Sequence, residues 1–349
     1  MVYQTKLVHQ AQAAHRELEI AAIRRRLLEW YQKHKRDLPW RRTRDPYGIW
    51  ISEIMLQQTR AAAVIPYYER FLALFPDAPA LASAPEQDLL AAWAGLGYYA
   101  RARNVQKAAR LIVELPRFPS DYAGLRQLPG VGDYTAAAVA SIAFGKPHAV
   151  LDGNVLRVLS RMVAEQGDIK SPAVRRGLAT LADKLLHRAR PGEFNQALME
   201  LGATVCVPKQ PRCGRCPVRA HCQARQRGVE NQLPLQGVRP TAERREKHLL
   251  AIEKGDKILL WRRPPGSPRL AGFWELPERE QLPAATLPGA AAGDFRHTIV
   301  HTTYLVQVYR ASIRARPSGF QWLAKGGLGS LPLSTIAKKA LILLAGIRG

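Results

Sequence analysis

The chain has 349 residues, enough for about two domains, and 47% of them are hydrophobic, so a wholly disordered protein is excluded. Lys and Arg outnumber Asp and Glu by 52 to 28, and the resulting formal charge of +24 indicates a polyanionic partner, most simply nucleic acid. No stretch approaches the ~18–20 apolar residues of a membrane span, and the N-terminus lacks the apolar core of an export signal. We therefore expect a soluble, cytoplasmic protein that associates with the nucleoid by binding DNA.

Up to about Cys222 the chain predicts helices, because apolar residues recur at intervals of three and four. The expected helices span residues 19–31, 47–75, 85–94, 104–115, 135–144, 154–163 and 193–201. Further on, aliphatic and β-branched runs predict strands at 249–252, 257–261 and 302–308, before a closing helix at 334–347. The predicted fold is an all-α N-terminal region (residues 1–223), a polar linker (224–245) and a small α+β domain (246–349).

All four cysteines lie within a single stretch with C-x6-C-x2-C-x5-C spacing: Cys206, Cys213, Cys216 and Cys222. Thiolates that bind one metal centre must come from a compact segment, so this clustering predicts a metal site. A disulfide framework is the alternative, but it is typical of short secreted chains. The spacing alone admits both zinc and an iron–sulfur cluster.

The sharpest motif outside the cysteines is Leu-Pro-Gly-Val-Gly, residues 128–132. Gly130 and Gly132 allow a tight turn at a helix N-terminus, where unpaired N–H groups and the positive end of the helix dipole favour a phosphate. An ordinary turn between helices is the alternative for such a short motif. The basic charge and the cysteine cluster favour the phosphate-binding interpretation for Gly130, Val131 and Gly132.

These motifs, with Val-Leu-Asp-Gly-Asn-Val at 150–155, resemble the helix-hairpin-helix DNA glycosylases of the endonuclease III superfamily. Three more segments resemble its adenine DNA glycosylase (MutY) branch: Leu-Pro-Trp-Arg at 38–41, Trp-Ile-Ser-Glu-Ile-Met-Leu-Gln-Gln-Thr at 50–59 and Gly-Leu-Gly-Tyr-Tyr-Ala-Arg at 95–101. The resemblance implies base excision repair of adenine mispaired with 8-oxoguanine or guanine in double-stranded DNA, by a monomer. It also implies that the four cysteines hold one 4Fe-4S cluster, which favours iron over zinc.

Cleavage of a purine N-glycosidic bond needs a proton donor for the base and a negative charge beside the sugar cation. Glu53 lies in an otherwise apolar helical turn, which should raise its pKa, although most single glutamates are solvated. Asp152 precedes an apolar helix and could be a plain N-cap. The resemblance assigns Glu53 as the general acid at adenine N7 and Asp152 as the residue that stabilises or captures the sugar cation, oriented by Asn154.

Tyr134 occupies the position where the strand-cleaving members of the superfamily carry a Schiff-base lysine. A phenol cannot form a Schiff base, so the resemblance implies a monofunctional enzyme in which Tyr134 hydrogen-bonds the catalytic carboxylate. Core packing of this tyrosine is the alternative.

The extruded base needs a pocket, and the gap that it leaves needs a filler. The resemblance places Trp40, Arg41, Leu56 and Gln196 at the flipped adenine, with core packing as the alternative for Trp40 and Leu56. It assigns contacts with the partner strand to Gln58, Thr59 and Tyr99.

The C-terminal region resembles the Nudix-like domain that senses 8-oxoguanine in this family. A Nudix box needs Arg-Glu followed after two residues by Glu-Glu to hold magnesium, but Arg279-Glu280 is followed by Gln-Leu-Pro-Ala at 281–284, so we expect no nucleotide hydrolysis. The recognition loop is expected at His297, Thr298, Val300 and His301, where Ile299 and Val300 replace the family's Phe and Ser. Valine cannot donate the hydroxyl hydrogen bond, so weaker discrimination of 8-oxoguanine is predicted.

Two other classes of function remain to be separated. The first is a glycosylase for thymine or uracil in mismatches, or one with lyase activity; Arg41, Glu53 and Tyr134 argue against it. The second is a non-enzymatic DNA-binding or redox-sensing cluster protein, which would not need both carboxylates.

Overall fold

The computed structural model describes residues 2–237, 243–267, 270–287, 289–299 and 301–345. The chain forms two compact units, and each is described by itself. The first comprises Met1–Leu72, Asp77–Pro79 and Lys107–Val238. The second comprises Ala73–Pro76, Ala80–Gln106 and Arg239–Gly349. The domain boundaries 1–223 and 246–349 stay a prediction.

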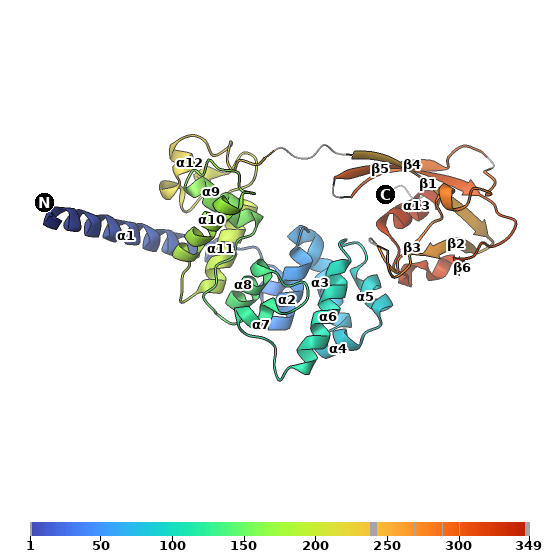
Figure 1. Cartoon of the computed structure of the whole chain (residues 1–349), viewed down its shortest axis with the longest axis horizontal. Coiled ribbons are helices and arrows are strands. Elements are labelled where there is room, and N and C mark those ends of the chain that lie inside the picture. The colour runs from blue at the N-terminus through green and yellow to red at the C-terminus, as the bar shows by residue number, and fades with distance from the viewer. Residues whose placement is uncertain (1, 238–242, 268–269, 288, 300, 346–349) are drawn as a thin grey trace. The chain divides into compact units, whose positions relative to one another are not determined.

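Helices make up the chain from its N-terminus through the cysteine segment (Figure 1). They are α1 (Val2–His34), α2 (Pro46–Leu56), α3 (Ala61–Leu74), α4 (Ala78–Ser83), α5 (Glu86–Trp93), α6 (Ala100–Glu114), α7 (Tyr122–Arg126), α8 (Asp133–Ile142), α9 (Gly153–Met162), α10 (Pro172–Leu185), α11 (Pro191–Thr204) and α12 (Gln223–Gln226). Short 3-10 turns lie at Pro39–Arg41, Cys213–Arg215 and Arg219–His221. None of the described helices is both long and apolar enough to cross a membrane.

Helix α11 lies at the centre of the first unit, packed against α1, α8 and α9. Its apolar side chains, with those of α1 and α9, form one core that includes the fully buried Leu27, Val155, Leu159 and Phe194. Small residues let the helices approach closely: a Cβ added at Gly192 would stand 2.6 Å from the carbonyl oxygen of Ser141 on α8. This close packing fixes where α11 presents its polar side chains.

The predicted helix 47–75 is two helices. Helix α2 ends at Leu56 and α3 begins at Ala61. Between them Gln58 has φ +58, a left-handed conformation that ends the helix although neither Gly nor Pro marks the position. Helices α4, α7 and α10 were not predicted, because α4 and α7 are short and charged residues interrupt the apolar pattern of α10.

The second unit contains a mixed six-stranded sheet, which confirms the predicted α+β class. Its strands are β1 (Glu243–Lys254), β2 (Lys257–Arg262), β3 (Trp274–Glu275), β4 (Gly293–Ile299), β5 (Thr302–Ala311) and β6 (Phe320–Ala324). The strand order is β3-β2-β1-β5-β4, and β6 also pairs with β2. Strand β1 pairs in parallel with β5, from Glu243 opposite Thr302 to Ile252 opposite Ala311.

Helix α13 (Thr335–Leu344) packs against β3 and β4 and completes this unit (Figure 1). Its N-cap Ser334 accepts a hydrogen bond from the Ala337 amide. The core beneath it includes the buried Leu249, Ile258 and Val306. Shorter 3-10 turns follow β3 at Arg279–Gln281 and β6 at Lys325–Ser330.

Along its first part, the predicted linker 224–245 is packed against the helical region and is not exposed throughout. Ala224 and Leu233 are buried in a small cluster with Ala164, and the Ile169 amide donates to the Leu235 carbonyl oxygen. At its other end β1 already begins at Glu243. A polar composition predicted exposure here, but a few apolar side chains suffice to anchor the segment.

Candidate active site

Glu53 lies on α2, a helix whose residues 47–55 are all buried. The helix begins cleanly because Asp45 caps it and Pro46 occupies its first turn. The Glu53 side chain is 4% exposed, and burial raises its pKa to about 7, assisted by the charge of Asp152 and opposed by the hydrogen bond from Tyr134. Near neutral pH this carboxyl group therefore carries a proton that it can give to a ligand.

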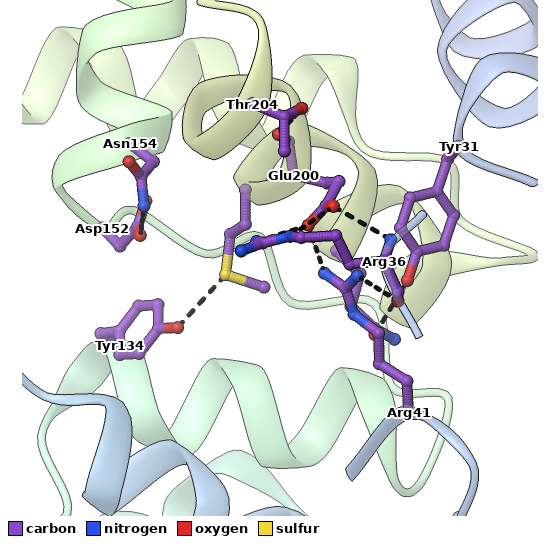
Figure 2. A network of polar contacts seen from close by, with 10 residues as sticks. Tyr31, Arg36, Arg41, Tyr134, Asp152, Asn154, Glu200 and Thr204 are labelled. Atoms are coloured by element: carbon purple, nitrogen blue, oxygen red, sulfur yellow. Dashed lines mark hydrogen bonds and ion pairs between the residues drawn. The ribbon is translucent and has the colours of Figure 1, made fainter. Parts of the chain in front are cut away.

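Tyr134 lies in the first turn of α8 and its hydroxyl donates to Glu53 Oε2 at 2.8 Å. The hydroxyl oxygen of Tyr134 is also 3.2 Å from the sulfur of Met199 on α11 (Figure 2). Burial and the adjacent Glu53 raise the pKa of Tyr134 well above its usual value, so it stays a neutral donor. The contact that the resemblance implied between Tyr134 and a carboxylate is present, and it is made to Glu53.

Asp152 is the N-cap of α9, as its alternative interpretation had it, and it also faces the pocket. Oδ1 accepts from the Val155 amide at 2.6 Å, and Oδ2 accepts from Asn154 Nδ2 at 2.9 Å. Burial raises the pKa of Asp152, and these hydrogen bonds oppose the rise. Helix capping thus holds the carboxylate in one orientation, and the carboxylate can still accept a further hydrogen bond.

Asn154 is held in turn by Arg157. The Arg157 Nη2 donates to Asn154 Oδ1 at 2.8 Å and to the Gly202 carbonyl oxygen at 2.8 Å, while Nε donates to the Cys206 carbonyl oxygen at 2.8 Å. A chain of hydrogen bonds therefore joins Asp152 to the backbone of the cysteine segment.

One pocket of about 950 Å³ unites the predicted pocket and catalytic residues of the first unit. It is lined by Trp40, Arg41, Glu53, Leu56, Gln58, Thr59, Tyr134, Asp152, Asn154 and Gln196. Gln196 accepts from the Tyr31 hydroxyl at 3.0 Å, and Trp40, 6% exposed, packs edge-on against Tyr68. Core packing and pocket lining are therefore compatible for Trp40.

Several residues of this pocket were missed from the sequence, among them Arg36, Met199 and Glu200. Glu200 is fully buried between Arg36 and Arg41 (Figure 2). Burial favours the neutral acid, but the hydrogen bonds from Arg36 and Arg41 outweigh it and lower the pKa of Glu200 to about 2. No local signal could have found this pair of contacts, because the partners are about 160 residues apart in the chain.

The Leu-Pro-Gly-Val-Gly turn joins α7 to α8 as a helical hairpin. Gly130 has φ +79, which favours glycine, and the Val131 amide is already bonded to the Leu128 carbonyl oxygen at 3.1 Å. Val131 packs its side chain inward, whereas Gly130 and Gly132 are exposed. The exposed glycines face solvent at the start of α8.

Tyr99 lies just before α6 and is 6% exposed, with its hydroxyl accepting from the Gly95 amide. The neighbouring Tyr98 is 46% exposed and has φ +49. Within this turn, the side chain available to a ligand is that of Tyr98, a residue that the sequence argument passed over.

The four cysteines line one small pocket with Arg161, Arg219 and Arg225, and none forms a disulfide. Among the described residues, no three His, Cys, Asp or Glu side chains are grouped closely enough to bind a single metal ion. Thiolates around one zinc must all reach the same ion at ≈2.3 Å, whereas those around a cluster bind different irons. Four thiols that line one pocket are a donor set suited to a metal centre.

Comparison with known proteins agrees with this geometry. Residues 51–184 match the model of the HhH-GPD superfamily base excision DNA repair proteins. The chain is 37% identical to the human adenine DNA glycosylase, over 92% of this chain and 73% of the human protein. It is 35% identical to that of Buchnera aphidicola from Acyrthosiphon pisum, over 67% and 68% of the two chains.

The chain belongs to the adenine DNA glycosylase family. Among solved structures, a thermostable thymine-DNA glycosylase matches with a TM-score of 0.56 and 30% identity, over 60% of this chain and 98% of the other. Endonuclease III in a non-covalent complex with DNA matches with a TM-score of 0.51 and 24% identity over the same shares, which supports the fold. As an adenine DNA glycosylase, the chain is an N-glycosyl hydrolase of base excision repair that acts on DNA.

The predicted recognition loop of this adenine DNA glycosylase lies mostly in a strand. His297 and Thr298 belong to β4, where the Thr298 and Thr303 hydroxyls are 3.1 Å apart. Burial, then the charge of Lys339, lowers the pKa of His297. His301 is exposed next to β5, and Val300 lies outside the described residues.

Proposed function

We propose that this adenine DNA glycosylase is monofunctional and releases adenine mispaired with 8-oxoguanine or guanine, leaving an abasic site. The observation that carries the proposal is the placement of Glu53, Asp152 and Tyr134 around one pocket. A buried acid with a raised pKa and a fixed carboxylate are the two groups that glycosidic cleavage requires.

In this proposal Glu53 protonates adenine at N7, which makes the base a better leaving group. Asp152, held by Val155 and Asn154, places its negative charge beside the developing oxocarbenium ion. Tyr134 donates to Glu53 and orients its carboxyl group. Because Tyr134 is a phenol, no Schiff base forms and the strand is left uncut.

A panel of duplexes tests the proposal. A:8-oxoguanine and A:G duplexes should lose adenine, and strand breaks should appear only after alkali treatment. T:G and thymine-glycol duplexes should remain intact. Release of thymine, or strand scission without alkali, would reject the proposal in favour of a thymine glycosylase or a lyase.

We infer that Cys206, Cys213, Cys216 and Cys222 hold one 4Fe-4S cluster. Their shared pocket and the guanidinium of Arg161, whose Nη1 donates to Cys206 Sγ at 3.3 Å, suit a centre carrying four thiolates. When bound, the cluster would cross-link the cysteine segment, so that the basic side chains of this segment face DNA. It would take no part in hydrolysis.

The DNA contacts follow from the same proposal. Gly130 and Gly132 would approach a phosphate at the start of α8, while Gln58 and Thr59, at the rim of the pocket, would meet the partner strand. The Nudix-like region would read 8-oxoguanine weakly, because Ile299 and Val300 replace Phe and Ser.

A further inference from the structure

One buried carboxylate of the pocket has no part in the chemistry above. The side chain of Glu200 has 0% exposure, and both of its oxygens are occupied. Oε1 accepts from the Arg36 amide at 3.1 Å and from Arg36 Nε at 2.8 Å. Oε2 accepts from Arg36 Nη2 and Arg41 Nη2, each at 2.8 Å. A carboxylate saturated by two guanidinium groups stays ionised and cannot act as an acid or base.

Arg41 is the member of this cluster that faces the candidate adenine site. Its side chain is 10% exposed, Nη1 donates to the Arg36 carbonyl oxygen at 3.1 Å, and the guanidinium lies over the Tyr31 ring at 5.4 Å. These contacts fix the plane of the guanidinium while occupying two of its five N–H groups. Adenine ring nitrogens are acceptors, so the remaining N–H groups suit the base.

We propose that Glu200 is a positioning residue, which orients Arg41 toward the extruded adenine and balances the charge of that guanidinium beside Glu53. This inference rests on the proposed role of Arg41 in the adenine pocket. The side chain of Glu200 acts through Arg41 and does not itself touch the base.

The charge balance has a measurable effect on the acid. Arg41 already lowers the pKa of Glu53 through its charge. If Glu200 becomes neutral, the positive charge of Arg41 near Glu53 is no longer compensated, and the pKa of Glu53 should fall. The decline of the excision rate with rising pH should then begin at a lower pH. A role confined to folding stability would not produce this displacement.

The experiment measures single-turnover adenine excision by the full-length protein across a range of pH, for Glu200→Gln, Arg41→Ala and the double variant. Glu193→Gln is the matched control, because Glu193 lies on the same helix as Glu200 and its replacement breaks a partly exposed ion pair with the N-cap residue Arg190. Loss of one charge-assisted hydrogen bond predicts that Glu200→Gln slows excision by roughly ten-fold or more, with duplex binding nearly unchanged. The double variant should be no slower than Arg41→Ala. The control should match the unmodified protein.

Two results would overturn the inference: an unchanged rate and pH profile for Glu200→Gln, or losses that multiply in the double variant. Full excision by Arg41→Ala would instead reject the proposed adenine pocket, so the two failures are distinguishable. If Glu200→Gln does not fold by circular dichroism, Glu200→Asp replaces it. That variant keeps the charge and shortens the reach, so it should slow excision without displacing the pH profile; an unchanged rate would reject the inference.

Discussion

Three carboxylates line the pocket, and their partners decide how tightly each holds a proton. Glu53 is buried beside a neutral donor, Tyr134, and its pKa rises to about 7. Glu200 is buried between two arginines, and its pKa falls to about 2. Asp152 sits between these cases, with burial opposed by an amide and an asparagine. This separation distinguishes the acid from the residues that must remain charged.

The acid role of Glu53 predicts a pH dependence. Its pKa in the folded protein is raised, so the protonated form prevails below about pH 7 and is lost as pH rises through that value. The single-turnover rate should therefore decline above about pH 7, approaching ten-fold for each unit. Glu53→Gln should abolish release while duplex binding persists, because the amide cannot give up that proton. A rate independent of pH well into the alkaline range would contradict the assignment.

The two adjacent tyrosines predict opposite phenotypes. Tyr98→Ala should weaken duplex binding several-fold, since an exposed aromatic side chain can stack on a base, and should leave the melting temperature nearly unchanged. Tyr99→Ala should lower the melting temperature sharply, because emptying a buried aromatic site costs ~3–5 kcal/mol. Duplex-binding assays and thermal melts on both variants test whether Tyr98 contributes to DNA binding and Tyr99 to folding stability. If Tyr99→Ala melts normally and binds poorly, the original assignment of Tyr99 to the partner strand holds.

Residue patterns predicted the burial of Glu53 better than they predicted the residues around it. The residues around Glu53 are almost all apolar, on every face of α2, and a helix that is apolar all round is buried, so the burial of Glu53 follows directly from the sequence. Arg36 and Met199 reach the pocket only through tertiary packing, as does Glu200, so no local spacing indicates them. The αL conformation of Gln58 was also beyond sequence reasoning, since glutamine rarely adopts it.

At the level of elements, the contact between α9 and α11 sets the position of Asn154. A Cβ at Gly202 would stand 2.6 Å from Asn154 Cβ, well inside contact distance. Gly202→Ala should therefore displace Asn154 and with it Asp152, slowing excision at least ten-fold and destabilising the fold by ~1–3 kcal/mol. Gly177→Ala on α10, where an added Cβ meets nothing within 4 Å, is the matched control. Equal activities for the two variants would contradict the proposed crowding.

Element boundaries were predicted well where turn residues mark them. Pro191 and Gly192 are the first residues of α11, two positions before the predicted start at 193, and the predicted helices at 135–144 and 154–163 correspond to α8 and α9. Strands β3, β4 and β6 escaped prediction, because β3 has two residues and the other two contain no fully buried side chain. These segments become strands because they pair with neighbouring strands of the sheet, which local sequence does not reveal.

For the whole molecule, the cysteine pocket predicts iron. The purified protein should absorb broadly in the visible range and contain about four irons per chain, the complement of one cluster on four thiolates. Cys206→Ser should lower iron content and weaken DNA binding, because the segment carries Lys209, Arg212, Arg215 and Arg219. Colourless protein containing one zinc would contradict the cluster.

The region around β4 predicts weak discrimination between guanine and 8-oxoguanine. A lost neutral hydrogen bond changes an equilibrium by about 0.5–1.5 kcal/mol, or roughly 2- to 13-fold. Val300→Ser should restore part of the preference, measured as dissociation constants for a non-cleavable adenine analogue opposite each base. Strong discrimination by the unmodified protein, unaltered by Val300→Ser, would place recognition elsewhere in the chain.

Helix α11 serves several parts of the site along a single rod of 14 residues. Asn195 bonds the Val150 amide ahead of Asp152, Met199 touches Tyr134, and Glu200 holds Arg41. Cys206 follows only two residues after the helix ends. Evolution consequently has little freedom to retune this helix for a different base, since shifting it along its axis would disturb Tyr134, the segment before Asp152 and the cysteines together. New base preferences in this architecture should arise from lining residues outside α11, such as Trp40 and Leu56.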